Sequence, residues 1–105
     1  MDVRIRPHTL AGAVTPPPSK SMAHRLLLAA ALADGVSTVQ NVALSQDIEA
    51  TLRAISAIGA KVEAADGGIQ ITPIANAPES TVIDCGESGS TLRFILPVCA
   101  ALGIR

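Results

Sequence analysis

The chain has 105 residues, a formal net charge of −1, 49% hydrophobic residues and a single aromatic residue. This length predicts one domain, and the apolar fraction excludes a disordered chain. The near-neutral charge and the lack of stacking rings argue against nucleic-acid binding. The longest apolar run, Leu26–Ala33, is too short to cross a membrane. The start lacks a basic segment before an apolar stretch, so we expect a cytoplasmic protein.

Two cysteines, Cys85 and Cys99, are too few for a disulfide framework, and no C-x-x-C pair suggests a zinc site. We therefore expect buried thiols in a reducing compartment and no metal or cofactor. Without aromatic rings, the core has to be built from Ala, Leu, Ile and Val. Such small side chains bury little area each, so a core of this length is expected to be marginal on its own.

In chain order, a period-2 pattern predicts a strand at residues 3–7, and three prolines at 16–18 then impose an extended stop. A helix is expected over 19–34, with Gly35 as its carboxy-terminal stop. A β-branched, alternating stretch predicts a strand over 37–42.

A second helix is expected over 46–58, with Ser45 as its N-cap and Gly59 at its end. Two short strands, 61–65 and 69–72, flank Asp-Gly-Gly and predict a hairpin.

After a loop, residues 81–84 predict a short strand, and glycines at 86 and 89 bound a tight turn. A last helix is expected over 90–102, with Pro97 as a possible kink. The alternation of strands and helices predicts an α/β fold. The first and last predicted helices are apolar nearly all round, which favours burial against other parts of a larger protein.

The first segment with candidate chemistry is the start of the helix at 19–34. Lys20, His24 and Arg25 are cations near a helix amino terminus, where they oppose the helix dipole unless an anion binds there. Ser21 and Arg25 share one face, and Lys20 and His24 share an adjacent one. The alternative is an ordinary solvated helix start with Ser19 as its N-cap, and His24 by itself is expected to be a structural or spectator residue.

The second segment runs from Asp84 to Arg93, where a strand enters a glycine turn and a helix with hydroxyls at its start. It is neither a Walker A loop nor a G-x-S-x-G nucleophile elbow. The alternative is a plain capping turn, and Glu87 would repel an adjacent anion. Asp47, at the start of the middle helix, either supports capping or orients Arg25 or another cation.

Both segments closely resemble the two signatures of the 5-enolpyruvylshikimate-3-phosphate synthase family, in the right order and at the right spacing. The related UDP-N-acetylglucosamine enolpyruvyl transferases usually have Lys-Asn at positions 20–21, so they fit less well. The chain departs from the family pattern at Glu87 and Phe94. The resemblance covers Val14 to Leu102, and its motifs are Pro17-Pro18-Ser19-Lys20-Ser21, His24-Arg25, Ser45-Gln46-Asp47 and Asp84 to Arg93.

The resemblance implies an α/β fold with an enolpyruvyl transferase-like βαβαββ unit and the start of a second, within an inside-out α/β barrel. It implies a strand and crossover at 1–15, a first repeat unit at 16–75 and the start of the next unit at 76–105. Because the family's enzymes are some four times longer, the 105-residue chain is expected to be an amino-terminal part, inactive alone, whose partner is the remainder of the enzyme.

The resemblance also implies transfer of the enolpyruvyl group of phosphoenolpyruvate to the 5-hydroxyl of shikimate 3-phosphate. By matched position, Lys20 contacts both substrates, and Ser21 and Arg25 hold shikimate 3-phosphate. The Gly89 amide reaches phosphoenolpyruvate with Ser90 beside it. Supporting positions are held by Arg93 and Asp47. The alternative is a non-catalytic anion-binding or assembly module, and no residue of the chain is expected to carry out the chemical step itself.

Overall fold

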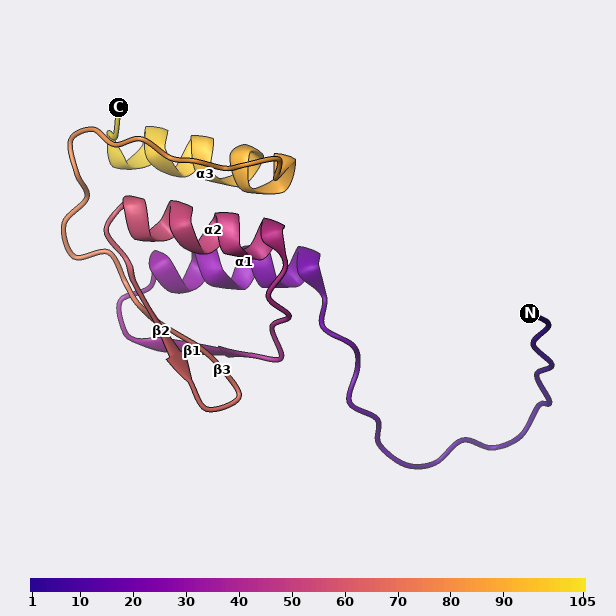
Figure 1. Ribbon diagram of the computed structural model, residues 1–105. Coiled ribbons are helices and arrows are strands. Elements are labelled where there is room, and N and C mark those ends of the chain that lie inside the picture. Colours follow the sequence, from indigo (N-terminus) through magenta and orange to yellow (C-terminus); the bar gives the residue numbers. More distant parts are fainter.

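The computed structural model describes residues 1–105 and contains three helices and one three-stranded sheet (Figure 1). The elements follow in the order α1 (Lys20–Ala31), β1 (Ser37–Gln40), α2 (Gln46–Ala57), β2 (Lys61–Ala65), β3 (Gly68–Thr72) and α3 (Gly89–Leu102). Helices α1 and α2 lie on the sheet, and α3 packs on α2 on the side away from the sheet. All three helices begin at the same end of the body in Figure 1.

The sheet has the order β1-β3-β2, with β3 antiparallel to both neighbours. Strands β1 and β2 are therefore parallel to each other, and α2 forms the crossover between them. The predicted hairpin is confirmed, with β3 beginning at Gly68 and a two-residue Asp66-Gly67 turn. Gly67 has a φ of +73°, a left-handed conformation that glycine adopts without steric cost.

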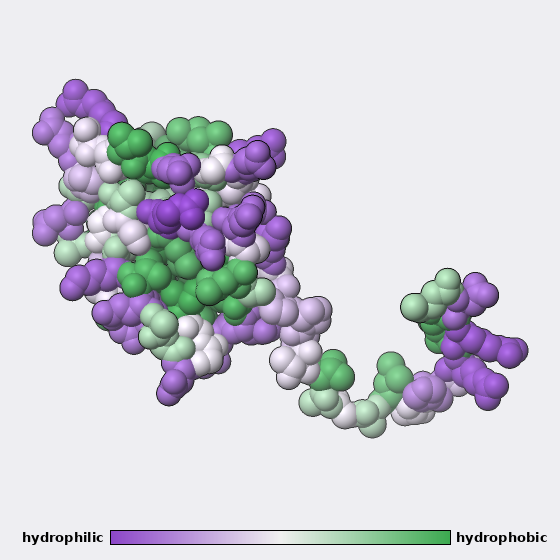
Figure 2. All heavy atoms as spheres, in the orientation of Figure 1, coloured by the Kyte–Doolittle hydropathy of each residue, from purple (hydrophilic) through white to green (hydrophobic).

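The core is aliphatic, as the composition predicts. Side chains from α1, α2 and the sheet are completely buried, among them Leu27, Ile48, Ile55 and Ile71. Helix α3 contributes little to this core, because only Thr91 and Ile95 of it are buried. Its remaining apolar side chains are exposed or half-buried, and Figure 2 shows apolar surface over α3 and again at the level of α1.

A serine caps each of the three helices in the same way. Ser19, Ser45 and Ser88 have extended backbones, and each side chain accepts a hydrogen bond from the backbone N–H three residues later. This satisfies one of the free donors in the first turn. The caps at Ser19 and Ser45 were predicted. The last helix begins at Gly89, one residue earlier than predicted, because Ser88 is its cap.

Two predicted strands are absent, and in both places the reason is the lack of a pairing partner. Residues 3–7 lie in an exposed arm that leads away from the body, where no strand runs beside them (Figure 1). Residues 81–84 lie in the segment that runs back along α3 (Figure 1), and the Thr81 N–H donates to the carbonyl oxygen of Arg105 at 2.9 Å instead of joining the sheet. A period-2 pattern favours an extended backbone, but a strand also needs a neighbour.

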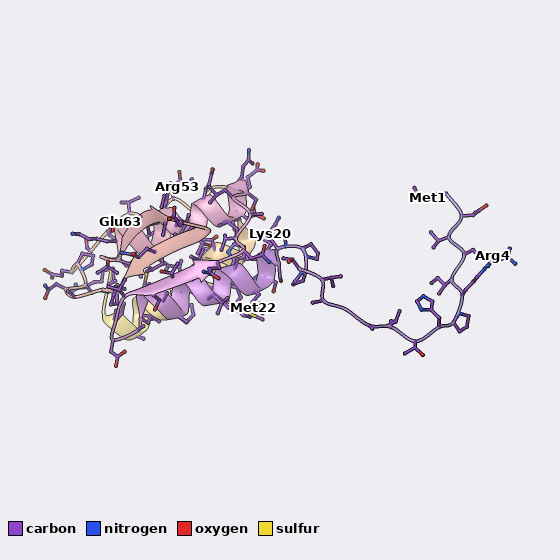
Figure 3. All side chains as sticks on the ribbon, turned by 90° about the horizontal axis from the view of Figure 1, so that it is seen from below. Met1, Arg4, Lys20, Met22, Arg53 and Glu63 are labelled. Atoms are coloured by element: carbon purple, nitrogen blue, oxygen red, sulfur yellow. The ribbon has the colours of Figure 1, made fainter.

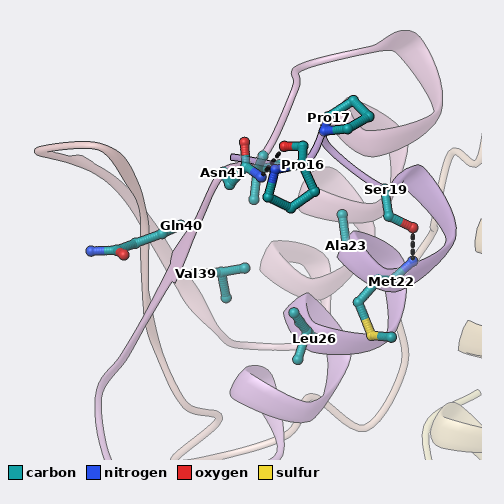
Figure 4. Close-up of a pocket in the computed structure, with 10 residues that line it drawn as sticks. Pro16, Pro17, Ser19, Met22, Ala23, Leu26, Val39, Gln40 and Asn41 are labelled. Carbon is teal, nitrogen blue, oxygen red and sulfur yellow. Dashed lines mark hydrogen bonds between the residues drawn. The ribbon is translucent and has the colours of Figure 1, made fainter. Parts of the chain in front are cut away.

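The last residues of the arm are fastened to the body. The Asn41 side-chain Nδ2 donates to the Pro16 carbonyl oxygen at 3.2 Å, and the prolines beside it line an apolar hollow between α1 and β1 (Figure 4). Asn41 itself has a φ of +56°, a conformation that asparagine tolerates better than most residues. This contact fixes the direction in which the chain enters α1.

None of the helices has the length and apolar character that crossing a membrane requires.

We predict that Gly68→Ala destabilises the fold. An added Cβ would overlap the carbonyl oxygen of Val39 on the paired strand β1, so the two strands would have to separate. Overpacking of this kind costs roughly 1–3 kcal/mol. Chemical denaturation of the two chains measures the difference. Gly35→Ala is the matched control, because a Cβ there meets no atom within 4 Å; equal loss in both variants would contradict the prediction.

Candidate functional site

The first turns of α1, α2 and α3 gather at one end of the body, because the three helices run in the same direction (Figure 1). Each first turn presents unpaired backbone N–H groups and the positive end of a helix dipole. Lys20 lies at this end, where the arm joins α1 (Figure 3). The arrangement therefore brings together the positive ends of three helix dipoles from separate segments of the chain.

Arg25 is held in place by contacts with two helices. Its Nη1 donates to the Ser21 carbonyl oxygen at 2.9 Å and also to the Ser21 hydroxyl. Its guanidinium carbon lies 5.1 Å from the centre of the Phe94 ring on α3, which is a cation–π contact. Both Ser21 and Arg25 remain exposed, so the guanidinium is oriented and still open to a ligand.

Lys20 pairs with Asp47 across the α1–α2 interface, with Nζ 2.9 Å from Oδ2. The lysine side chain is 57% exposed and the aspartate side chain 38% exposed. Exposed ion pairs contribute little to stability, so this one orients the lysine more than it holds the fold together. The sequence left two roles open for Asp47, support of capping or orientation of Arg25 or another cation. The structure shows that Asp47 contacts Lys20 and does not contact Arg25.

Gly89, Ser90 and Arg93 lie in the first two turns of α3, and all three are exposed. No hydrogen bond or ion pair joins them to α1 or α2. The structure therefore brings Lys20 and Asp47 into direct contact, whereas these α3 residues share only the same end of the body. A Cβ added at Gly89 would meet no neighbouring atom within 4 Å.

A polar hollow of about 280 Å³ lies between the start of α2 and the turn before α3. Its lining includes the carboxylates of Asp47, Glu49 and Glu87 and one guanidinium, that of Arg53. This excess of negative charge does not suit an anion. An anionic ligand is therefore not expected inside this hollow, whose lining includes neither Lys20 and Arg25 nor Gly89 and Ser90.

Below the exposed cations, a chain of buried polar side chains crosses the three helices. His24 Nδ1 lies 2.7 Å from Thr51 Oγ1, which lies 2.7 Å from Thr91 Oγ1. Thr91 Oγ1 also lies 2.7 Å from Ser88 Oγ and donates to the Asp47 carbonyl oxygen at 3.3 Å. His24, Thr51 and Thr91 are each at most 2% exposed.

The sequence reading assigned a structural or spectator role to His24 and did not single out Thr51 or Thr91. The sequence did hold a signal for the burial of Thr51, because it lies three residues after Ile48 and four before Ile55, within the apolar stripe of α2. Burial lowers the pKa of His24, and Lys20 and Arg25 lower it further, whereas Asp47 opposes them. The ring is therefore held neutral inside a group of charged side chains.

Both cysteines are free thiols, and they are half-buried where the sequence predicted buried ones. Burial raises the pKa of the Cys99 thiol, and Cys85 raises it further. A raised pKa leaves little thiolate at neutral pH, so this thiol is a poor nucleophile.

Residues 5–105 match the family model described as EPSP synthase (3-phosphoshikimate 1-carboxyvinyltransferase). The chain is 46% identical over 108 residues to the 3-phosphoshikimate 1-carboxyvinyltransferase of Clostridium beijerinckii, covering 94% of this chain and 25% of that protein. It is 41% identical over 111 residues to the protein of the same name from Clostridioides difficile, with 94% and 25% covered.

Among solved structures, the fold is similar to EPSP synthase from Acinetobacter baumannii, with a TM-score of 0.65 and 31% sequence identity, over 78% of this chain and 19% of that one. This likeness confirms the predicted α/β fold class. The chain spans about a quarter of the length of the curated relatives that it matches. Because the family model covers nearly every residue, the chain belongs to the EPSP synthase family.

Proposed function

We propose that this chain supplies part of an active site that transfers the enolpyruvyl group of phosphoenolpyruvate to the 5-hydroxyl of shikimate 3-phosphate, with release of phosphate. The names of the relatives support this reaction. The observation that carries the proposal is the meeting of three helix amino termini with Lys20 and Arg25 at one end of the body.

Both proposed substrates are anions, so the first demand of the reaction is to bring like charges together. Free N–H groups of a helix start and fixed cations meet that demand without reorganising during the reaction. Arg25 offers a planar fork suited to the phosphate of shikimate 3-phosphate, and Ser21 adds a hydroxyl beside it. Lys20, oriented by Asp47, offers a point charge that contacts both substrates.

The start of α3 is proposed to receive phosphoenolpyruvate. The Gly89 amide and the Ser90 hydroxyl are exposed there, and Arg93 lies one turn further along the helix. Asp47 supports the site by holding the Lys20 ammonium at 2.9 Å. These residues bind, orient and neutralise charge, and none of them is assigned the transfer of protons.

The direct test is a chimeric enzyme in which residues 1–105 replace the matching quarter of the Clostridium beijerinckii relative. We expect phosphate release that requires both substrates. Lys20→Ala in the chimera is expected to lower kcat/KM by about 100-fold, the scale seen when one charge-stabilising donor is removed. Steady-state kinetics measures the effect. The 105-residue chain alone is expected to give no turnover.

Lys61→Ala is the matched control, because Lys61 is also an exposed lysine but follows the far end of α2, about 18 Å from its start. The same loss in both variants would mean that Lys20 acts through net charge alone. Equal turnover with and without shikimate 3-phosphate would reject the proposed reaction. A silent but folded chimera that still binds either substrate would favour the non-catalytic binding module.

A second prediction concerns Asp47→Asn. Because its ion pair with Lys20 is exposed, the free energy of unfolding should change by less than about 1 kcal/mol. In the chimera the same variant should raise KM for both substrates, because Lys20 loses the contact that orients it. Denaturation curves and kinetics on the same preparations separate the two effects. A large loss of stability would contradict the orienting role.

A further inference from the structure

Two contacts between α1 and α2 repeat at the spacing of one helical turn. Lys20 pairs with Asp47, and four residues later in both helices His24 pairs with Thr51, so both pairs are separated by 27 residues. The first pair is exposed to solvent and the second is buried. Residues four apart lie above one another on a helix face, so these contacts fix how α1 is rotated against α2.

The direction of the buried hydrogen bonds follows from the Asp47 carbonyl oxygen, the atom of this group that can accept but cannot donate. The Asp47 carbonyl oxygen takes the Thr91 hydroxyl proton, so Thr91 Oγ1 accepts from Thr51 and from Ser88. Thr51 has then given its only proton to Thr91 and has to accept from His24 Nδ1. The neutral ring therefore carries its proton on Nδ1.

The other ring nitrogen supports the same assignment. His24 Nε2 is buried and has no hydrogen-bond partner. A proton on Nε2 would be a buried donor without an acceptor, and protonating both nitrogens would also add positive charge close to Lys20 and Arg25. Asp47 of α2 is the only nearby group that favours the charged ring, and the face towards α3 is covered by Phe94, whose ring centre is 6.5 Å away.

We propose that His24, as the neutral Nδ1–H imidazole donating to Thr51, is a positioning residue that fixes the rotation of α1 and so aims Lys20 and Arg25 towards the start of α3. Its role in substrate binding rests on the proposed function, whereas its tautomer does not. The link to α3 runs through Thr51 and Thr91, so one hydrogen-bonded chain aligns all three helix starts.

Nitrogen-15 NMR of the imidazole rings in the 105-residue chain tests the tautomer. The chain has two histidines, and a His8→Gln variant assigns the signals. At pH 7 we expect His24 to show a protonated Nδ1 and a bare Nε2. Thr51→Ser should keep this signature, because the hydroxyl remains, whereas Thr51→Val should lose it. An Nε2–H tautomer, or the same signature in Thr51→Val as in the parent, would overturn the proposal.

The positioning role is measured in the chimera. Thr51→Val, which removes a hydroxyl at nearly constant volume, should raise KM for the anionic substrates at least about fivefold with a smaller change in kcat. Thr51→Ser should recover most of that loss. Unchanged KM in Thr51→Val would overturn the positioning role. An inactive parent chimera would count against the proposed function alone, because the NMR result stands separately.

The pH dependence of stability provides a further measurement. The folded state lowers the pKa of His24 below the reference value of 6.5, so the unfolded chain binds the proton more readily. The free energy of unfolding should therefore be highest above about pH 6.5 and should fall as the pH is lowered through that value. His24→Asn, which keeps a donor for Thr51 but does not titrate, should remove this part of the slope. An unchanged slope would contradict the buried, neutral state of His24.

Discussion

The candidate site depends on the hydrogen-bonded chain that joins His24, Thr51 and Thr91 inside the apolar body. Each residue comes from a different helix, and each side chain is buried, so no link is replaced by water without opening the interface. A buried polar group without a partner is costly, which makes one mutual arrangement of the helices strongly preferred. Thr91 lies in the first turn of α3, and His24 and Thr51 lie in the second turns of α1 and α2. The hydrogen bonds between them therefore align the three helix starts.

This polar alignment matters because the apolar attraction around it is non-directional. The core consists of small aliphatic side chains, and α3 contributes to it mainly through Ile95. Apolar attraction has no preferred direction, whereas a hydrogen bond joins two particular atoms at a defined distance and angle. The geometry of the exposed contacts of Lys20 with Asp47 and of Arg25 with Phe94 then depends on the buried hydrogen bonds that fix the helices.

Much of the secondary structure was readable from local patterns. The caps at Ser19 and Ser45, the two-residue turn before Gly68 and the helical spacing of the apolar residues each depend on neighbours within one turn. The two expected strands that are absent, at 3–7 and 81–84, had the correct alternation but no partner. A strand is completed by residues far away in the sequence, so its local pattern is not sufficient.

The sequence by itself determined the residue types of the site and their helix starts, because capping and cations near a helix amino terminus are local features. Only the tertiary structure decided that Asp47 contacts Lys20, that Phe94 lies against Arg25, and that Thr51 links its two neighbours. These pairs join different helices. Their formation depends on how the helices are rotated and packed, and no local pattern records that.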